Sequence, residues 1–108
     1  MSTEIINETL VKKLLECSTE CQKCMAACLQ EEDVSMMARC IELDIDCSEV
    51  CTVTGAFAAR NSESLSTLLA VCAEICRACA DECKKHDAQH CQACARVCDD
   101  CAEMCELG

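Results

Sequence analysis

The segment Cys72-Ala-Glu-Ile-Cys76-Arg-Ala-Cys79-Ala-Asp-Glu-Cys83 carries cysteine at successive steps of four, three and four residues. Side chains at such steps lie on one face of an α-helix. Similar runs occur in three other parts of the chain. The sixteen cysteines are Cys17, Cys21, Cys24, Cys28, Cys40, Cys47, Cys51, Cys72, Cys76, Cys79, Cys83, Cys91, Cys94, Cys98, Cys101 and Cys105. The spacing predicts four helices, each with a line of thiols along one side, which we call a thiol stripe.

The rest of the composition also favours helices over strands. The chain of 108 residues contains no proline, two glycines and one aromatic residue, Phe57. Strands are typically rich in β-branched and aromatic residues and are separated by turn signals every few positions. A chain of this length usually forms one domain. We therefore predict a single all-α domain over residues 1–108.

Polar clusters divide the chain into four helical segments. The expected helices run from about Thr3 to Gln30, from Val34 to Ala59 with Asp33 or Ser35 as a cap, from a cap at Asn61 or Ser62 to Lys85, and from a cap at Asp87 to Glu106. Short connections make consecutive helices antiparallel. The sequence thus predicts an antiparallel up-down-up-down four-helix bundle with a cysteine-lined core.

Charge and the N-terminal sequence restrict the partners and the compartment. The formal net charge of −11 argues against nucleic acid and anionic membrane surfaces as partners. The first residues resemble no export signal, and no segment is apolar enough to span a bilayer. We therefore expect a cytoplasmic protein, in which thiols stay reduced. A disulfide scaffold is the alternative, although cysteines three or four residues apart on one helix are poorly placed for a disulfide.

The two ends of the expected bundle differ in chemistry. With a rise of about 1.5 Å per residue, the cysteines of the four helices fall into approximate layers along the bundle axis. The end that holds the turns near residues 31–33 and 86–87 is called the histidine end here. The opposite end, called the plug end, carries apolar residues in place of cysteine: Ile6, Leu10, Leu14, Phe57, Leu65, Leu68, Leu69 and Leu107. We expect this apolar cluster to carry much of the folding stability.

Four side chains at the histidine end are candidate metal ligands besides the cysteines. His86 and His90 are expected on the thiol stripes, because each is three or four residues from a cysteine of the same run. Two imidazoles at one end of a sulfur-lined core favour a role in capturing incoming metal. Met36 and Met37 could be ligands or could fill gaps in the packing.

A carboxylate also lies on a stripe, because Asp44 shares a helical face with Cys40 and Cys47. A carboxylate inside a sulfur-lined core is costly unless it is paired or bound. Asp44 could turn to the flank, accept hydrogen bonds from thiols or ligate a metal ion, and the sequence leaves these options open.

The density of thiols indicates a soft metal ion. Thiolate ligands select Cu(I), Zn(II), Cd(II) or iron–sulfur clusters. A Zn(II) ion with four thiolates keeps a charge of −2, so several such sites in one apolar core are expensive. Cu(I) bridged by thiolates can form a nearly neutral core. The loop motif of iron–sulfur proteins is absent, as is the βαβ setting of a thioredoxin-like C-x-x-C.

Two segments are similar to the bacterial copper storage proteins. They are the run from Cys72 to Cys83 followed by Lys84-Lys85-His86-Asp87, His90-Cys91-Gln92-Ala93-Cys94-Ala95 and Cys98, and the segment Cys40-Ile-Glu-Leu-Asp44-Ile-Asp-Cys47. The likeness extends over essentially the whole chain and is to the cytosolic branch of the family. It implies storage or buffering of many Cu(I) ions, loading through the histidine end, and a homotetramer of bundles.

We therefore expect a binding protein rather than an enzyme, since no nucleophile–base pair is evident. In this interpretation a small-thiol carrier or a copper chaperone delivers Cu(I), which then moves inward by exchange between thiols. A Zn- or Cd-sequestering protein similar to metallothionein is the first alternative. A redox or disulfide-based interaction module is the second.

Overall fold

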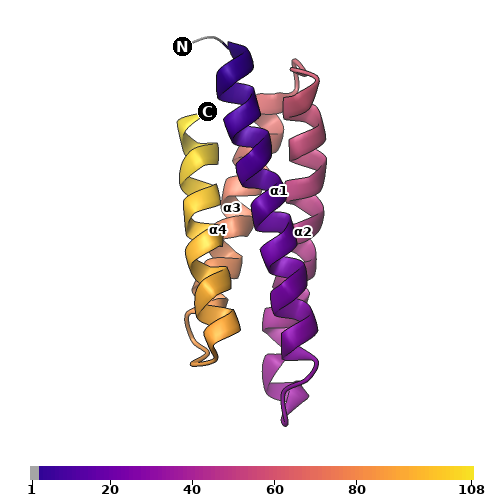
Figure 1. Cartoon of the computed structure of the whole chain (residues 1–108), viewed down its shortest axis with the longest axis vertical. Helices are drawn as coiled ribbons and strands as arrows, with labels where there is room; N and C mark the ends of the chain where they lie inside the picture. The colour runs from indigo at the N-terminus through magenta and orange to yellow at the C-terminus, as the bar shows by residue number, and fades with distance from the viewer. Residues whose placement is uncertain (1–2) are drawn as a thin grey trace.

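The computed structural model describes the backbone of residues 3–108 and the side chains from residue 7 onward. The elements are α1 (Thr3–Cys28), the 3₁₀-helix η1 (Val34–Met37), α2 (Ala38–Ala59), α3 (Leu65–Cys83) and α4 (Gln89–Leu107). Figure 1 shows the long helices side by side, each running opposite to the one before it. Helix α1 packs against α2 and α4, and α3 packs against the same two helices. The predicted antiparallel four-helix bundle is confirmed, and no strand occurs within residues 3–108.

Several helix ends differ from the prediction. Helices α1 and α3 each stop two residues early, because the chain after them tightens into bonds between residues three apart. The amide of Glu31 donates to the Cys28 carbonyl at 3.1 Å, and that of His86 donates to the Cys83 carbonyl at 3.1 Å. For the same reason, the segment that starts at Val34 begins as a 3₁₀-helix and becomes α-helical only at Ala38.

The predicted side-chain caps are wrong. Ser64 and Ala88, and not the predicted Ser62 and Asp87, precede α3 and α4, and neither caps its helix with a side chain. The Ser62 hydroxyl accepts a hydrogen bond of 3.1 Å from the Ser64 amide within the turn before α3. Asp33 precedes η1 without capping it, and instead accepts a hydrogen bond of 2.6 Å from the Ser35 hydroxyl. Competition from such short-range bonds within a turn explains why a cap residue in the sequence did not become a cap in the structure.

The end of α2 is fixed by backbone geometry, as the predicted break at residues 60–62 requires. Asn61 has a φ of 51°, in the left-handed region that asparagine tolerates better than most residues. The amide of Ser62 donates to the Phe57 carbonyl at 3.0 Å, and that of Asn61 donates to the Ala58 carbonyl at 3.1 Å. This pair of bonds is a Schellman motif, which satisfies the last carbonyls of the helix.

All sixteen cysteines are buried in the core, so the predicted cysteine-lined interior is confirmed. At the plug end, the described side chains Leu10, Leu14 and Leu69 are buried, and Phe57, Leu65 and Leu68 are half-buried. Ile6 lies outside the described side chains. The prediction for Leu107 is wrong, because this residue is 82% exposed. Leu107 follows Cys105 by two residues, which is about 200° around the helix, so it points away from the stripe.

Polar contacts between helices hold the bundle in register. Ser18 of α1 contacts the hydroxyls of Ser48 at 3.0 Å and Thr52 at 2.8 Å, and it donates to the Ser48 carbonyl at 3.1 Å. On the other side of the bundle, Arg77 of α3 pairs with Asp99 at 3.0 Å and Glu106 at 2.6 Å on α4. A shift along the axis would break these contacts and misalign the thiols.

We predict that Leu14→Ala lowers the free energy of unfolding of the reduced, metal-free protein by about 3 kcal/mol, because it leaves a cavity at the plug end. Leu14 is fully buried, whereas its neighbour Leu15 is 49% exposed. Leu15→Ala is therefore the matched control and should cost less than about 1 kcal/mol. Urea unfolding under reducing conditions measures both, and similar losses would contradict the assigned role of Leu14.

Candidate metal centre

The thiols of different helices meet along the axis of the bundle. The sulfur–sulfur distances are 3.5 Å for Cys40 and Cys83, 3.6 Å for Cys21 and Cys98, and 3.8 Å for Cys51 and Cys72. These are contacts between reduced thiols, and all sixteen cysteines are free. The alternative of a disulfide scaffold is therefore wrong for this structure.

The sulfurs form overlapping groups of four. Within each group, the possible ligand atoms all lie within 4.8 Å of one another. Such groups include Cys17, Cys51, Cys76 and Cys101; Cys17, Cys21, Cys47 and Cys98; Cys21, Cys79, Cys94 and Cys98; and Cys24, Cys28, Cys40 and Cys91. Because neighbouring groups share members, the thiols form one continuous column instead of isolated sites. A shared sulfur is placed to bridge two metal ions.

Burial keeps the outer thiols of this column protonated in the metal-free protein. It raises the pKa of the Cys28 thiol, and it raises the pKa of the Cys91 thiol to about 12. The negative charge that the neighbouring Cys40 sulfur would carry acts in the same direction. The thiolate is the form that binds metal, so each ion must displace protons when it enters.

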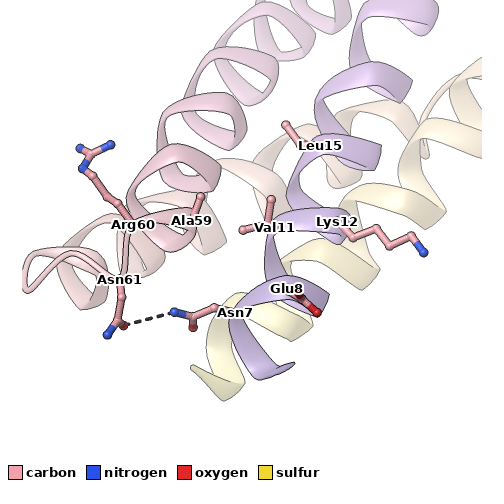
Figure 2. Close-up of a pocket in the computed structure, with 8 residues that line it drawn as sticks. All are labelled: Asn7, Glu8, Val11, Lys12, Leu15, Ala59, Arg60 and Asn61. Carbon is pink, nitrogen blue, oxygen red and sulfur yellow. Dashed lines mark hydrogen bonds between the residues drawn. The ribbon is translucent and has the colours of Figure 1, made fainter. Parts of the chain in front are cut away.

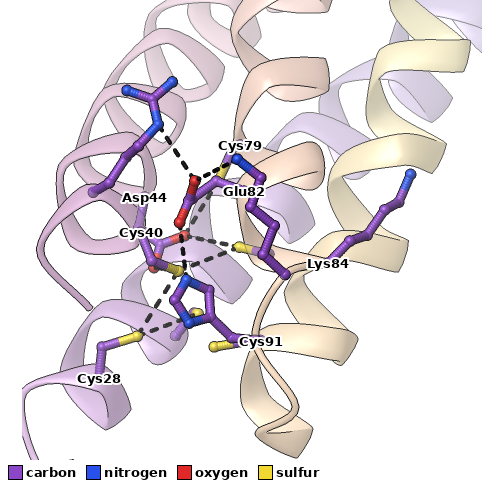
Figure 3. Close-up of polar contacts among 12 residues, drawn as sticks. Cys28, Cys40, Asp44, Cys79, Glu82, Lys84 and Cys91 are labelled. Atoms are coloured by element: carbon purple, nitrogen blue, oxygen red, sulfur yellow. Dashed lines mark hydrogen bonds and ion pairs between the residues drawn. The ribbon is translucent and has the colours of Figure 1, made fainter. Parts of the chain in front are cut away.

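Asp44 lies fully buried in the column and accepts hydrogen bonds from thiols of three helices. Its Oδ1 atom lies 3.3 Å from the Cys79 sulfur, 3.4 Å from that of Cys94 and 3.8 Å from that of Cys83. Its Oδ2 atom lies 3.9 Å from the Cys40 sulfur. Figure 3 shows Asp44 among these contacts, beside Cys40 and Cys79.

The electrostatic environment of Asp44 favours a neutral carboxyl group. Burial, reinforced by the nearby sulfurs of Cys94 and Cys79, raises the pKa of Asp44 to about 10. Among the three options that the sequence left open, the structure has the hydrogen-bonded one. Asp44 also groups with Cys24, Cys40 and Cys83 within 4.8 Å, so its oxygen is positioned as a ligand as well.

His90 closes the column at the histidine end. This residue lies in the first turn of α4, and its Nδ1 atom is 3.5 Å from the Cys91 sulfur, 3.7 Å from that of Cys24 and 3.9 Å from that of Cys28. Its Nε2 atom lies 2.8 Å from Oε1 of Glu31, in the connection between α1 and α2. The imidazole therefore joins three thiols on one side to a carboxylate on the other.

His86 is placed differently from the prediction. It lies in the turn after α3, where its Nε2 atom is 2.9 Å from Oε2 of Glu82, and no hydrogen bond to a thiol is found for it among the described residues. Arg39 and Lys85 hold the other oxygen of Glu82 at 3.3 Å and 3.4 Å. Although partial burial opposes it, His86 and Lys85 lower the pKa of the Glu82 carboxyl. His86 thus belongs to an ion-pair cluster around the buried Glu82, beside the column.

The two candidate methionines differ in their exposure to solvent. Met37 is buried and packs in the core, whereas Met36 is 68% exposed. Both belong to η1, where successive side chains point in different directions. Met36 is therefore accessible to an incoming ion, and Met37 contributes to packing.

Two acidic residues of the histidine end were missed in the sequence. Glu82 could have been found, because it precedes His86 by four residues on one helical face. Glu31 could not, because it is 59 residues from His90 in the chain and belongs to a polar turn without periodicity.

A surface pocket of about 890 Å³ lies between the start of α1 and the end of α2, at the plug end of the bundle. Figure 2 shows its lining residues, which are Asn7, Glu8, Val11, Lys12, Leu15, Ala59, Arg60 and Asn61. The Asn7 amide donates to Asn61 Oδ1 at 3.2 Å across it. None of its described lining residues offers a sulfur or imidazole ligand, so we do not count the pocket as part of the metal centre.

We predict that Asp44→Asn removes part of the pH dependence of stability. In the unfolded chain Asp44 ionises near pH 4, whereas in the folded chain it keeps its proton up to about pH 10. The contribution of this carboxyl to stability is therefore lost as the pH rises through this interval, by at most about 1.4 kcal/mol per pH unit. Asparagine does not ionise. The free energy of unfolding of the variant should therefore rise relative to that of the wild type between pH 6 and pH 8.

Urea unfolding of the reduced, metal-free proteins at the two pH values measures this difference. Asp46→Asn is the matched control, because Asp46 is exposed on the same helix. If the difference in the free energy of unfolding between wild type and Asp44→Asn is the same at both pH values, the prediction is contradicted.

The chain matches the sequence model of the copper storage proteins over residues 4–107. It is 37% identical over 90 residues to an uncharacterised cysteine-rich protein of Bacillus subtilis (strain 168), with 83% of each chain covered. No described helix is long and apolar enough to cross a membrane.

Two solved structures are closely similar to the bundle. Metal-free copper storage protein 3 from Bacillus subtilis is 37% identical, with a TM-score of 0.87 over 93% of this chain and 95% of that chain. A cytosolic copper storage protein from Streptomyces lividans, loaded with five coppers, is 33% identical, with a TM-score of 0.93 over 97% and 92%. The resemblance noted in the sequence is thus confirmed, and so is a storage role instead of a catalytic one. The chain belongs to the copper storage protein family.

Proposed function

We propose that this protein stores and buffers many Cu(I) ions in the column of thiols that lines its core. The observation that carries this function is the set of sixteen buried, reduced cysteines whose sulfurs form overlapping groups of possible ligands. Soft thiolates select Cu(I), and shared sulfurs let the number of ions approach the number of thiols. Copper is the cargo of the protein and not a resident cofactor.

Loading begins at the histidine end. His90 and the three thiols beside it, Cys24, Cys28 and Cys91, capture the ion. The ion then moves inward by exchange between neighbouring sulfurs, and each thiol gives up its proton when it binds. His86 and Met36 are proposed as contacts made before this step, because both lie at the same end and Met36 is exposed.

The cellular setting is proposed from the family. The similar protein from Streptomyces lividans is described as cytosolic, and a cytoplasmic location would keep the thiols reduced. A small-thiol carrier or a copper chaperone would deliver Cu(I) there. Residues 1–108 would act as a single metal-binding domain and assemble as a homotetramer. Exposed apolar side chains on one side of η1 and α2, Val34 and Ile45, are available for such a contact.

Sequestration of Zn(II) or Cd(II) is the second candidate function. Three of the four-sulfur groups share no residue. They are Cys17, Cys51, Cys76 and Cys101; Cys21, Cys79, Cys94 and Cys98; and Cys24, Cys28, Cys40 and Cys91. Each could hold one tetrahedral ion. The charge of −2 that remains on each such site would have to be buried, which favours Cu(I).

We predict that anaerobic titration of the reduced protein against a chelator that competes for Cu(I) gives uptake of about one ion per thiol or more. The parallel Zn(II) titration should give weak uptake. Saturation at about four Zn(II) ions, as expected for four thiolates per ion, together with poor retention of Cu(I), would favour the second candidate function.

We predict that His90→Phe slows the first phase of Cu(I) loading by about tenfold, comparable with the loss of other groups around metal sites. Final capacity should change little, because all sixteen thiols remain. His86→Phe is the comparison variant and should have a smaller effect, since His86 contacts Glu82 instead of thiols. Stopped-flow loading from a chelator complex measures both rates. A wild-type rate for His90→Phe would remove the proposed capture role.

A further inference from the structure

The imidazole of His90 is held between chemically different neighbours on its two edges. Its Nδ1 atom lies 3.5–3.9 Å from the sulfurs of Cys91, Cys24 and Cys28, and its Nε2 atom lies 2.8 Å from Oε1 of Glu31. A neutral imidazole carries one proton, on one of its two nitrogens. A carboxylate can only accept, so the Nε2 atom must be the donor. The lone pair of Nδ1 then faces the three sulfurs.

We infer that Glu31 is a positioning residue that makes His90 competent to capture Cu(I). It fixes both the tautomer and the orientation of the ring, so that the unprotonated nitrogen points into the thiol column. Imidazoles that bind metal generally need such a partner on the other nitrogen, and its loss weakens metal sites. This inference rests on the proposed capture of copper at the histidine end.

The backbone places Glu31 for this role. The amide of Glu31 donates to the Cys28 carbonyl at 3.1 Å, so the carboxylate is anchored one turn beyond a thiol that His90 also faces. The turn therefore presents a sulfur to one edge of the ring and an oxygen to the other. Glu31 is half-buried, whereas the next residue, Glu32, is exposed.

The second carboxylate–imidazole pair at this end lacks these features. Glu82 holds the Nε2 atom of His86 at 2.9 Å, but its other oxygen is bound by Arg39 and Lys85. Glu82 is thus shared among three partners, whereas Glu31 faces His90 alone among the ion pairs of the described residues. The structure therefore assigns the positioning role to Glu31 and not to Glu82.

Three variants of the full chain test this inference. Glu31→Gln keeps an oxygen that accepts from the ring and removes the charge. Glu31→Leu removes the acceptor with a similar volume. Glu32→Leu is the matched control for loss of one surface charge. The ¹⁵N chemical shifts of the imidazole nitrogens in the metal-free protein report the tautomer, and stopped-flow kinetics report Cu(I) loading.

We expect wild type, Glu31→Gln and Glu32→Leu to hold His90 with the proton on Nε2 and to load at similar rates. Glu31→Leu should show averaged nitrogen shifts and load about tenfold more slowly. In a His90→Phe background, Glu31→Leu should cause no further slowing, because the residue acts through the ring.

The opposite results would overturn the inference. Unchanged nitrogen shifts and loading in Glu31→Leu would show that Glu31 does not position the ring. Equal slowing in Glu31→Gln and Glu32→Leu would show that only net charge matters. If His90→Phe loads like the wild type, the capture role itself fails, and the nitrogen shifts of Glu31→Leu still decide independently whether Glu31 orients His90.

Discussion

The spacing between neighbouring sulfurs is the constraint on which the structure depends. Thiols of facing helices lie 3.5–3.9 Å apart, which is ordinary contact for reduced sulfur. At this distance they pack as small hydrophobic groups and fill the interior without metal. The same distance leaves adjacent sulfurs close enough to share an ion. One geometry thus serves both a folded empty protein and a filled one.

This spacing demands helices that approach closely and cannot slide. Alanines at buried positions, including Ala80, Ala95 and Ala102, leave room for the approach. The hydroxyl contacts of Ser18 and the ion pairs of Arg77 limit movement along the axis. Large apolar groups are concentrated at the plug end, where Leu14 is fully buried. The plug end of the four helices therefore contributes mainly to stability, and the rest of their length carries the thiols that bind metal.

The periodicity of cysteine was sufficient to predict the helices, their antiparallel order and the content of the core, because steps of three and four have one simple structural meaning. The ends of the helices could not be predicted as well. Short bonds within turns, such as that from Ser35 to Asp33, compete with capping and are not visible in a pattern. Leu107 was also mispredicted, because it lies two residues past the last cysteine of the stripe and so points to solvent.

The histidine end was predicted in outline and not in detail. Sequence spacing treats His86 and His90 alike, yet only His90 reaches the thiols among the described contacts. The difference arises because His86 lies in a turn, where helical spacing no longer tells where a side chain points. Glu31 depends on contact between segments far apart in the chain, and such contacts are set by tertiary packing.

Thiols that keep their protons in the empty core, as burial favours for Cys28 and Cys91, have a consequence for the outside of the molecule. A monovalent ion that replaces the hydrogen of a thiol substitutes one positive charge for another. With one ion per thiol, the formal charge of −11 is then the same in the empty and the full protein. Its electric field, its repulsion from other copies and its affinity for charged surfaces would not reveal how much cargo it holds. Any cellular component that distinguishes the two forms must do so by sensing shape or by touching the metal.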